Sequence, residues 1–484
     1  MEGSVVTGAF ARALKQLASW RADNPERRPA YDVWPADALG DTVPPSANGA
    51  PLIGTIGATR HLLDSGELRS IDLVERSLEA IKKHNDRLYA FVEILEVEAR
   101  ERAAKLDNEM RAGRIRGPLH GIPISVKDVI HVKGATTRAG SLAYEQRASK
   151  DAWAVKRLRD AGAIILGKSA THEFALGVSS AQSRNPHDDE RITGGSSGGS
   201  AVAVATGMGI ASLATETRAS TRVPAAVCGV VGLKPTYGTI PTTGIVPLAW
   251  TMDHFGILAP SVGDAAAMLD ALDDRKTVAR AIALGVAGMT LGAPHAAWGS
   301  VAADVDGSVR VALDTLGAAG AEVVEVDTPT DSDFDDASAA ALIISRCEAA
   351  SFHGGLDGDR SSYWPEVRDQ LDAADGVLAT DYIDAQRYRA WLRERMLTAI
   401  AGVDALVMPA SPVTAPRVDE ADEYLTVLSR NAILWSFVGF PAMSVPTIPA
   451  PGGLPVGVQI VAAPHAEPTM IAVGRAVERG VNAR

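Results

Sequence analysis

Residues 193–224 read TGGSSGGSAVAVATGMGIASLATETRASTRVP and hold two serine-bearing turns. The first turn, at 194–200, is rich in glycine, which permits backbone angles and close approaches that a Cβ atom would block. The run of Ala and Val at 200–206 predicts a short helix that can be packed on all sides. The second turn carries Ser220. Two hydroxyl groups brought together in this way indicate nucleophilic chemistry, provided that a base lies elsewhere in the chain.

The alternative for the first turn is a flexible linker, because Gly/Ser runs usually are linkers. A linker has no reason to be followed by uninterrupted segments of Ala, Val, Ile and Leu, as this turn is. We therefore interpret the glycine-rich turn as a loop built into a core.

The rest of the chain alternates between expected strands and helices. Of its 484 residues, 46% are hydrophobic, 5% are aromatic and 45 are glycine, which suits closely packed layers of small aliphatic side chains. The expected strands lie at 163–166, 290–293, 322–326, 406–408, 443–448 and 456–461, and the expected helices at 152–161, 301–316 and through most of 338–400. This alternation predicts an α/β fold, in which helices cover both faces of a mixed, largely parallel β-sheet as an α/β/α sandwich.

A boundary is expected near residue 50, where residues 43–49 are rich in Pro, Gly and Ser. We expect 1–50 to form an N-terminal arm and 51–484 to form one catalytic domain. The arm contains an expected amphipathic helix with three apolar residues on one face, Phe10, Leu14 and Leu17.

Composition and charge exclude several classes of protein. The net charge of −12 disfavours binding to nucleic acid and to anionic membranes. The only two cysteines, Cys228 and Cys347, lie in apolar surroundings, so we expect no disulfide and a reducing compartment. No segment reaches the roughly 18 apolar residues of a membrane span. Arg12 and Lys15 interrupt the place where a signal peptide needs its apolar run, so we expect a cytoplasmic protein.

Residues 162–169, GAIILGKS, fit the phosphate-loop pattern but not its structural context. That loop must follow a strand and wrap a phosphate with exposed backbone amides. Here the four intervening residues are themselves an expected strand, and the residues before Gly162 favour a helix. We therefore expect no ATP site. The sequences His172-Glu173 and His187-Asp188-Asp189 lack paired metal-ligand spacing, so we expect no metal and interpret both histidines as surface or core residues.

None of the ten histidines lies in an evident Ser-His-Asp arrangement that could supply a base for Ser220. A lysine can replace histidine if its amine is neutral, which requires desolvation or a neighbouring cation. Lys127 ends the aliphatic strand of GIPISVKD at 121–128 and is a candidate for such desolvation. The alternative is a solvated lysine paired with Asp128, and the spacing alone favours that alternative.

Several segments together resemble the amidase signature family. Lys127 lies within GIPISVKD, Ser196 within GGSSGGSA and Ser220 within TETRASTRVPA. Further similar segments are GVVGLKPTYG at 229–238, DALVMPASPV at 404–413 and the paired GFPAMSVP and GLPVGVQIV within 439–461. The resemblance covers about residues 55–475, and the joint spacing of these segments is highly specific.

The resemblance implies the amidase signature fold and a Ser–cis-Ser–Lys triad. Ser220 would be the nucleophile, Ser196 the bridging serine after a cis peptide bond, and Lys127 the base. The backbone N–H groups of three residues before the nucleophile, together with its own, would form the oxyanion hole: Thr217, Arg218 and Ala219. The family's chemistry requires no metal or cofactor.

The second turn departs from the family pattern Thr-Asp-x-Gly-Gly-Ser-Ile-Arg, because residues 215–222 read TETRASTR. Arg218 and Ala219 replace two glycines, which keeps the backbone amides but adds a charged side chain. Our hypothesis is that this change narrows or redirects the acyl pocket. The segment 177–193 is also shorter than usual in the family, which would open the cleft to larger substrates.

The resemblance favours a hydrolase that cleaves C–N bonds of small-molecule amides. A carbamate (urethane) hydrolase is a close alternative, because it uses the same tetrahedral chemistry. An amidotransferase subunit is ranked lower, and a non-catalytic or ATP-binding protein is the alternative from another class. The expected partner is a small amide or carbamate, with no nucleic acid and no membrane, and a homodimer stays open.

Overall fold

The computed structural model describes residues 5–23, 55–180, 182–276, 278–356 and 360–483. The predicted boundary at 43–49 lies outside the described residues. Most of the predicted strands and helices are present within two or three residues of their expected ends. Cys228 and Cys347 are both free, as predicted. Within the described ranges, no helix combines the length and the hydropathy that crossing a membrane requires.

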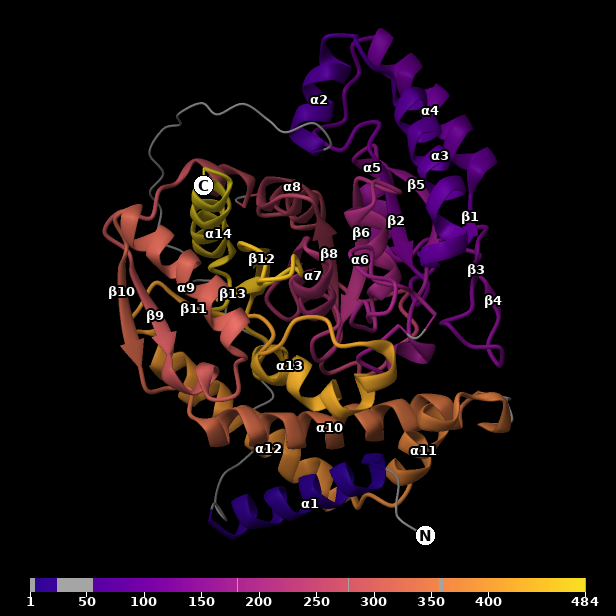
Figure 1. The fold of residues 1–484 in the computed structure, drawn as a ribbon. Coiled ribbons are helices and arrows are strands. Elements are labelled where there is room, and N and C mark those ends of the chain that lie inside the picture. Colours follow the sequence, from indigo (N-terminus) through magenta and orange to yellow (C-terminus); the bar gives the residue numbers. More distant parts are fainter. Residues whose placement is uncertain (1–4, 24–54, 181, 277, 357–359, 484) are drawn as a thin grey trace.

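A mixed sheet of 11 strands runs through the molecule (Figure 1). From one edge to the other the strands are β1 (Phe91–Ile94), β5 (Ile164–Ser169), β2 (Pro123–Lys127), β6 (Ala211–Glu216), β8 (His254–Ala259), β7 (Val231–Lys234), β12 (Ala442–Pro446), β13 (Gly457–Val461), β11 (Ala405–Pro409), β9 (Thr290–Pro294) and β10 (Glu322–Val326). Parallel pairs join β2 to β5 and β6 and, near the far edge, β9 to β10 and β11. The strands between these two groups pair antiparallel. The predicted α/β class with a mixed sheet is confirmed.

Helices cover both faces of the sheet, and each layer has its own apolar core. On one face pack α5 (Trp153–Asp160), α8 (Val262–Leu272), α9 (Ala303–Ala318) and α14 (Glu467–Asn482). On the other face pack α3 (Ser70–Leu88), α4 (Glu96–Arg111), α6 (Gly198–Ala205) and α7 (Arg222–Cys228). The predicted helix of Ala and Val is α6, and its residues are almost completely buried. Its small side chains let it lie close against the sheet.

A third layer of long helices lies beside this sandwich. It contains α10 (Asp331–Gly354), α11 (Pro365–Ala374), α12 (Ala379–Ile400) and α13 (Ala421–Val438). The start of α10 is set by a capping box. Thr330 Oγ1 accepts a bond from the Asp333 N–H group at 3.3 Å, and the Asp333 carboxylate accepts one from the Thr330 N–H group at 2.8 Å.

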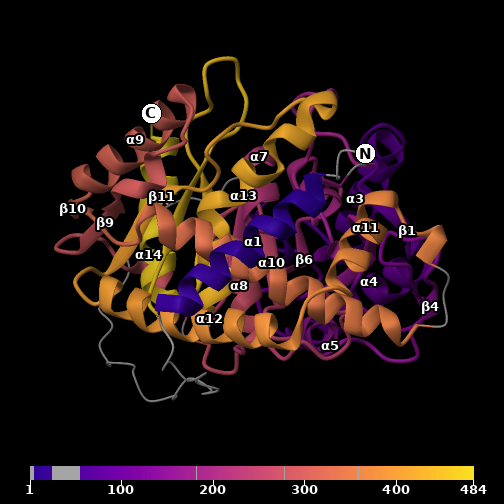
Figure 2. The same ribbon diagram turned by 90° about the horizontal axis from the view of Figure 1, so that it is seen from below.

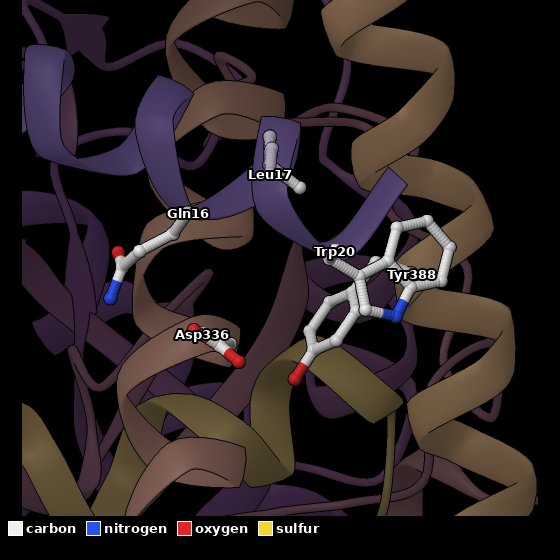
Figure 3. Close-up of a pocket in the computed structure, with 5 residues that line it drawn as sticks. All are labelled: Gln16, Leu17, Trp20, Asp336 and Tyr388. Carbon is white, nitrogen blue, oxygen red and sulfur yellow. The ribbon is translucent and has the colours of Figure 1, made fainter. Parts of the chain in front are cut away.

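The N-terminal helix α1 (Val5–Asp23) crosses this third layer on its outer side (Figure 2). The apolar face predicted for it is confirmed, because Phe10 and Leu17 are buried and Leu14 is half-buried in the same cluster. Trp20 meets Tyr388 of α12 edge to face, with 5.2 Å between ring centroids. Figure 3 shows a pocket at this contact, lined by Gln16, Leu17, Trp20, Asp336 and Tyr388. The helix is therefore packed against the third layer rather than separate from the rest of the fold.

Candidate active site

Lys127 is the last residue of β2, a strand buried along its whole length. The strand lies between two parallel neighbours, β5 and β6, so both of its faces are covered. Ile124 and Val126 pack into the apolar core, while the Lys127 side chain is completely buried. Of the two alternatives for Lys127, the structure therefore supports the desolvated lysine and not the solvated one.

Among the described residues, the Lys127 amine contacts two groups, both of them hydroxyls. Its Nζ donates to Ser196 Oγ at 2.7 Å and to Thr215 Oγ1 at 3.0 Å. Burial lowers the pKa of Lys127 to about 7, and the more distant carboxylates of Asp253 and Glu216 offset only part of that effect. Since an amine with a pKa near 7 is substantially neutral at neutral pH, Lys127 can accept a proton there.

The alternative pairing of Lys127 with Asp128 is wrong. The Asp128 carboxylate instead contacts Lys168 of β5, with 2.7 Å between Oδ1 and Nζ. Strand β2 ends at Lys127, and Asp128 lies in the turn that follows it, where its carboxylate contacts Lys168. Lys168, the lysine of the phosphate-loop pattern, is completely buried, and the segment around it is strand β5, as predicted from its apolar residues.

Ser196 is held by its backbone in the first turn. The peptide bond between Gly195 and Ser196 is cis, as the resemblance implies. A Cβ atom on Gly195 would lie 2.6–2.9 Å from the Ser179 backbone, so only glycine fits there. The Ser196 carbonyl accepts two bonds, from Ser180 Oγ at 3.0 Å and from the His172 N–H group at 3.2 Å. These contacts aim the Ser196 hydroxyl at Lys127.

Ser220 lies between the end of β6 and the start of α7 and is buried. The Ser197 N–H group donates to the Ser220 carbonyl at 3.3 Å, which joins the two serine turns. The Glu216 carboxylate accepts from the N–H groups of Thr221 and Arg222, at 2.9 and 3.1 Å. The Arg222 guanidinium forms a completely buried ion pair with the same carboxylate. The Glu216 carboxylate therefore fixes the backbone of the second turn immediately after Ser220.

The backbone of residues 217–220 presents unpaired donors. The N–H groups of Thr217, Arg218, Ala219 and Ser220 donate to no acceptor within the described ranges. Thr217 Oγ1 donates to Asp253 Oδ1 at 2.5 Å, which fixes the start of this loop. Burial raises the pKa of Asp253 to about 7. Consecutive free N–H groups beside a serine hydroxyl are suited to stabilise an oxyanion.

The structure thus places Lys127 against Ser196 and joins the Ser196 turn to the Ser220 turn through the backbone. Sequence reasoning missed Thr215, the second hydroxyl on Lys127, and Asp253, which contacts Thr217. Thr215 could have been predicted from its position in β6, because β6 pairs with β2, the strand that ends at Lys127. His172 is buried, as one of the two interpretations for it expected. In the part of the chain that the structure describes, no three His, Cys, Asp or Glu side chains could hold a metal ion together.

The structure is an α/β/α sandwich in which a buried lysine donates a hydrogen bond to a serine of a glycine-rich turn. These features define the class of the protein as an α/β protein with a serine–lysine site. The chain belongs to the Amidase family, whose model matches residues 72–471. It is 34% identical over 476 residues to a subunit of glutamyl-tRNA(Gln) amidotransferase from Koribacter versatilis (strain Ellin345), covering 89% of this chain and 98% of that one. It is 33% identical over 416 residues to an amidase from Pseudomonas putida, covering 81% of this chain and 88% of the relative. The native peptide amidase from Stenotrophomonas maltophilia has a similar structure, with a TM-score of 0.78, 30% identity and coverage of 89% and 97%.

Proposed function

We propose that this protein hydrolyses the C–N bond of small-molecule amides, with Ser220 as nucleophile, Ser196 as proton relay and Lys127 as base. The observation that carries the proposal is the buried Lys127 amine, which donates to Ser196 and touches no carboxylate among the described residues. A serine hydroxyl is a weak nucleophile until a base accepts its proton. A neutral lysine amine acting through a second hydroxyl supplies that base.

In the acylation step, Ser220 Oγ forms a bond to the amide carbonyl carbon. Its proton passes to Ser196 Oγ, and the Ser196 proton passes to Lys127 Nζ. In the tetrahedral intermediate the former carbonyl oxygen carries the negative charge, and the free N–H groups of residues 217–220 donate hydrogen bonds to it. Collapse breaks the C–N bond, and the proton returns through Ser196 to the leaving amine. Water then attacks the acyl-enzyme by the same route and releases the acid. Loss of one oxyanion donor costs about 2.7–4 kcal/mol in other hydrolases.

The test is hydrolysis of a panel of p-nitroanilides by the wild-type chain and by Ser220→Ala. We expect the rate of Ser220→Ala to fall at least about 10³-fold, because the remaining oxyanion donors act without a nucleophile. Ser149→Ala, at an exposed serine, is the matched control and is expected to keep the wild-type rate. A covalent acyl adduct on Ser220, trapped with a slowly hydrolysed p-nitrophenyl ester and found by mass spectrometry, is the direct readout. Equal rates in Ser220→Ala and wild type would overturn the proposal.

Carbamates are the close alternative substrate, since the same attack and collapse apply to them. A matched panel of p-nitrophenyl carbamates separates the two by the ratio of kcat/KM values.

A second function, within an amidotransferase complex, is favoured by one specific observation. The similar protein from Koribacter versatilis is named as a subunit of glutamyl-tRNA(Gln) amidotransferase and is matched along 98% of its length. Such a role predicts that free glutamine is hydrolysed and that the rate rises with a partner protein. Release of ammonia from glutamine, compared with release from a simple amide such as butyramide, distinguishes the two. A clear preference for butyramide rules out the second function.

A further inference from the structure

Among the described residues, two arginine side chains near the serine turns have no acidic partner. Arg218 lies in the loop before Ser220, and Arg346 lies on α10 with only 5% of its surface exposed. The Nε–H group of each guanidinium is buried and unbonded in the described structure. Neither forms an ion pair with a carboxylate of the described residues. A buried guanidinium without such a partner is costly, because water no longer solvates the charge.

Both arginines lie along the same stretch of α10. Arg218 Nη2 donates to Ser338 Oγ at 3.2 Å, and Arg346 lies eight residues further along that helix, a rise of about 12 Å. Residues separated by seven or eight positions share one helix face, and helical side chains lean towards the N-terminus. Arg346 therefore leans back towards the point where Arg218 meets the helix. Burial lowers the pKa of Arg346, and the nearby charge of Arg218 lowers it further.

The same pair borders the proposed catalytic groups. The Cα atoms of Arg218 and Ser220 are at most about 7 Å apart, since two peptide units separate them. Arg346 is close enough to His172 for its charge to add to burial, which lowers the pKa of His172 to about 4. The His172 N–H group donates to the Ser196 carbonyl, and its ring packs on Trp364 with 4.9 Å between centroids. Arg218 thus belongs to the Ser220 turn, and Arg346 lies near His172, whose backbone contacts the Ser196 turn.

We infer that Arg218 and Arg346 form a subsite for an anionic group of the substrate, a carboxylate within a few bonds of the scissile amide. The inference deepens the proposed amide hydrolysis and rests on it for the position of the scissile bond. A carboxylate accepts two parallel N–H bonds from a guanidinium, so it satisfies the unbonded Nε–H groups. Its charge also removes the repulsion between the two arginines. Arg218 belongs to the turn that carries Ser220, so the subsite lies beside the proposed nucleophile.

Matched pairs of substrates locate the carboxylate. The first pair is the mono-p-nitroanilide of glutaric acid and the p-nitroanilide of pentanoic acid, which differ by a carboxylate on the acyl side. The second is N-butyryl-4-aminobenzoate and N-butyrylaniline, which differ by a carboxylate on the leaving group. We expect the charged member of at least one pair to have a kcat/KM at least tenfold higher than its neutral partner. A ratio of one or less in both pairs overturns the inference.

Variants assign the preference to the arginines. Arg346→Gln is expected to reduce the charged-to-neutral ratio about tenfold, mainly through KM, and Arg346→Lys to retain part of it. Arg310→Gln, at an exposed arginine paired with Asp306, is the control and is expected to keep the ratio. An unchanged ratio in Arg346→Gln contradicts the inference. Because the substitution removes an unpaired buried charge, we expect the Tm of Arg346→Gln to equal or exceed that of wild type.

Binding without turnover separates this inference from the proposed function. Titration calorimetry of the wild-type chain with glutarate and with 4-acetamidobenzoate requires no hydrolysis. We expect one of the two to bind, and the Kd to rise at least tenfold in Arg346→Gln and with added salt. Hydrolysis of the neutral amides with no binding of either carboxylate at millimolar concentration overturns the subsite alone. Binding that depends on Arg346, in a chain that hydrolyses none of the panel, overturns the proposed function and keeps the subsite.

Discussion

The carboxyl ends of β2 and β5 hold two lysines in nearly equivalent places. The two strands pair in parallel, with Val126 opposite Lys168 and Lys127 opposite Ser169. Both lysine side chains are completely buried. The Lys168 amine contacts the Asp128 carboxylate at 2.7 Å and Thr137 Oγ1 at 3.1 Å, whereas the Lys127 amine contacts two hydroxyl groups. The end of β5 therefore carries a lysine in an ion pair, and the end of β2 carries a lysine that is hydrogen-bonded to hydroxyl groups.

The difference shows that burial alone does not define a catalytic lysine. Burial lowers the pKa of both amines, because the charged form loses its solvation. At Lys168 the adjacent Asp128 carboxylate opposes this effect through charge and hydrogen bonding. At Lys127 the opposing carboxylates are more distant, and the pKa lies near 7. The first arrangement serves the fold, and the second is suited to proton transfer.

The largest expected effect is on turnover by Lys127→Met. The substitution keeps an apolar chain in the buried site but removes the amine, so we expect kcat to fall by about 10⁴-fold. Steady-state kinetics on the p-nitroanilide panel measure this loss, with circular dichroism to establish that the variant is folded. If the folded Lys127→Met protein keeps more than a tenth of the wild-type kcat, Lys127 is not the base.

The second effect is on stability, at the other strand end. Lys168→Met leaves the buried Asp128 carboxylate uncompensated, so we expect the free energy of unfolding to fall by about 3–5 kcal/mol. Denaturant titration measures it, and the double variant Lys168→Met/Asp128→Leu is the control. The double variant should recover most of the loss, because no charge remains buried. If it is as unstable as the single variant, the pair is not what stabilises this region.

The third prediction is the pH dependence of kcat/KM. Protonation of Lys127 removes the base, so activity should fall about tenfold per unit below an apparent pKa near 7 and reach a plateau above it. Asp253 also has a pKa near 7 and contacts the 217–220 loop through Thr217. Asp253→Asn separates the two groups. Its acid limb should persist with a lower midpoint, because the Asp253 carboxylate raises the pKa of Lys127. Loss of the limb in this variant would assign the titration to Asp253 instead.

The smallest effect is expected from Thr215→Val. This substitution removes one of the two hydroxyl partners of the Lys127 amine at nearly constant side-chain size. A net hydrogen bond contributes about 1 kcal/mol, so we expect kcat/KM to fall about fivefold. The Thr215 hydroxyl accepts a hydrogen bond that stabilises the charged form of Lys127. Its removal should therefore also shift the midpoint of the pH profile to lower pH. A fall in rate with an unmoved midpoint would indicate a purely structural role for Thr215.

Local pattern predicted much of the architecture. The apolar run at 163–166 predicted a strand, which is β5, and the residues before it form the predicted helix, α5. The small residues at 200–206 predicted the buried helix α6. These features depend on periodicity and side-chain size over a few residues, which a sequence displays directly. The resemblance to the amidase signature family named Lys127, Ser196 and Ser220 because the residues around each are distinctive.

What the chain alone determined is the set of elements, the α/β class and the three residues proposed for chemistry. Tertiary structure decided which charges meet. Spacing favoured Asp128 as the partner of Lys127, but the Asp128 carboxylate contacts Lys168, 40 residues away. Thr215 and Ser196 reach Lys127 from 88 and 69 residues away. Arg218 meets α10 across 120 residues. A pKa or a binding subsite depends on such distant neighbours and on the exclusion of water, and neither can be deduced from neighbours in the sequence.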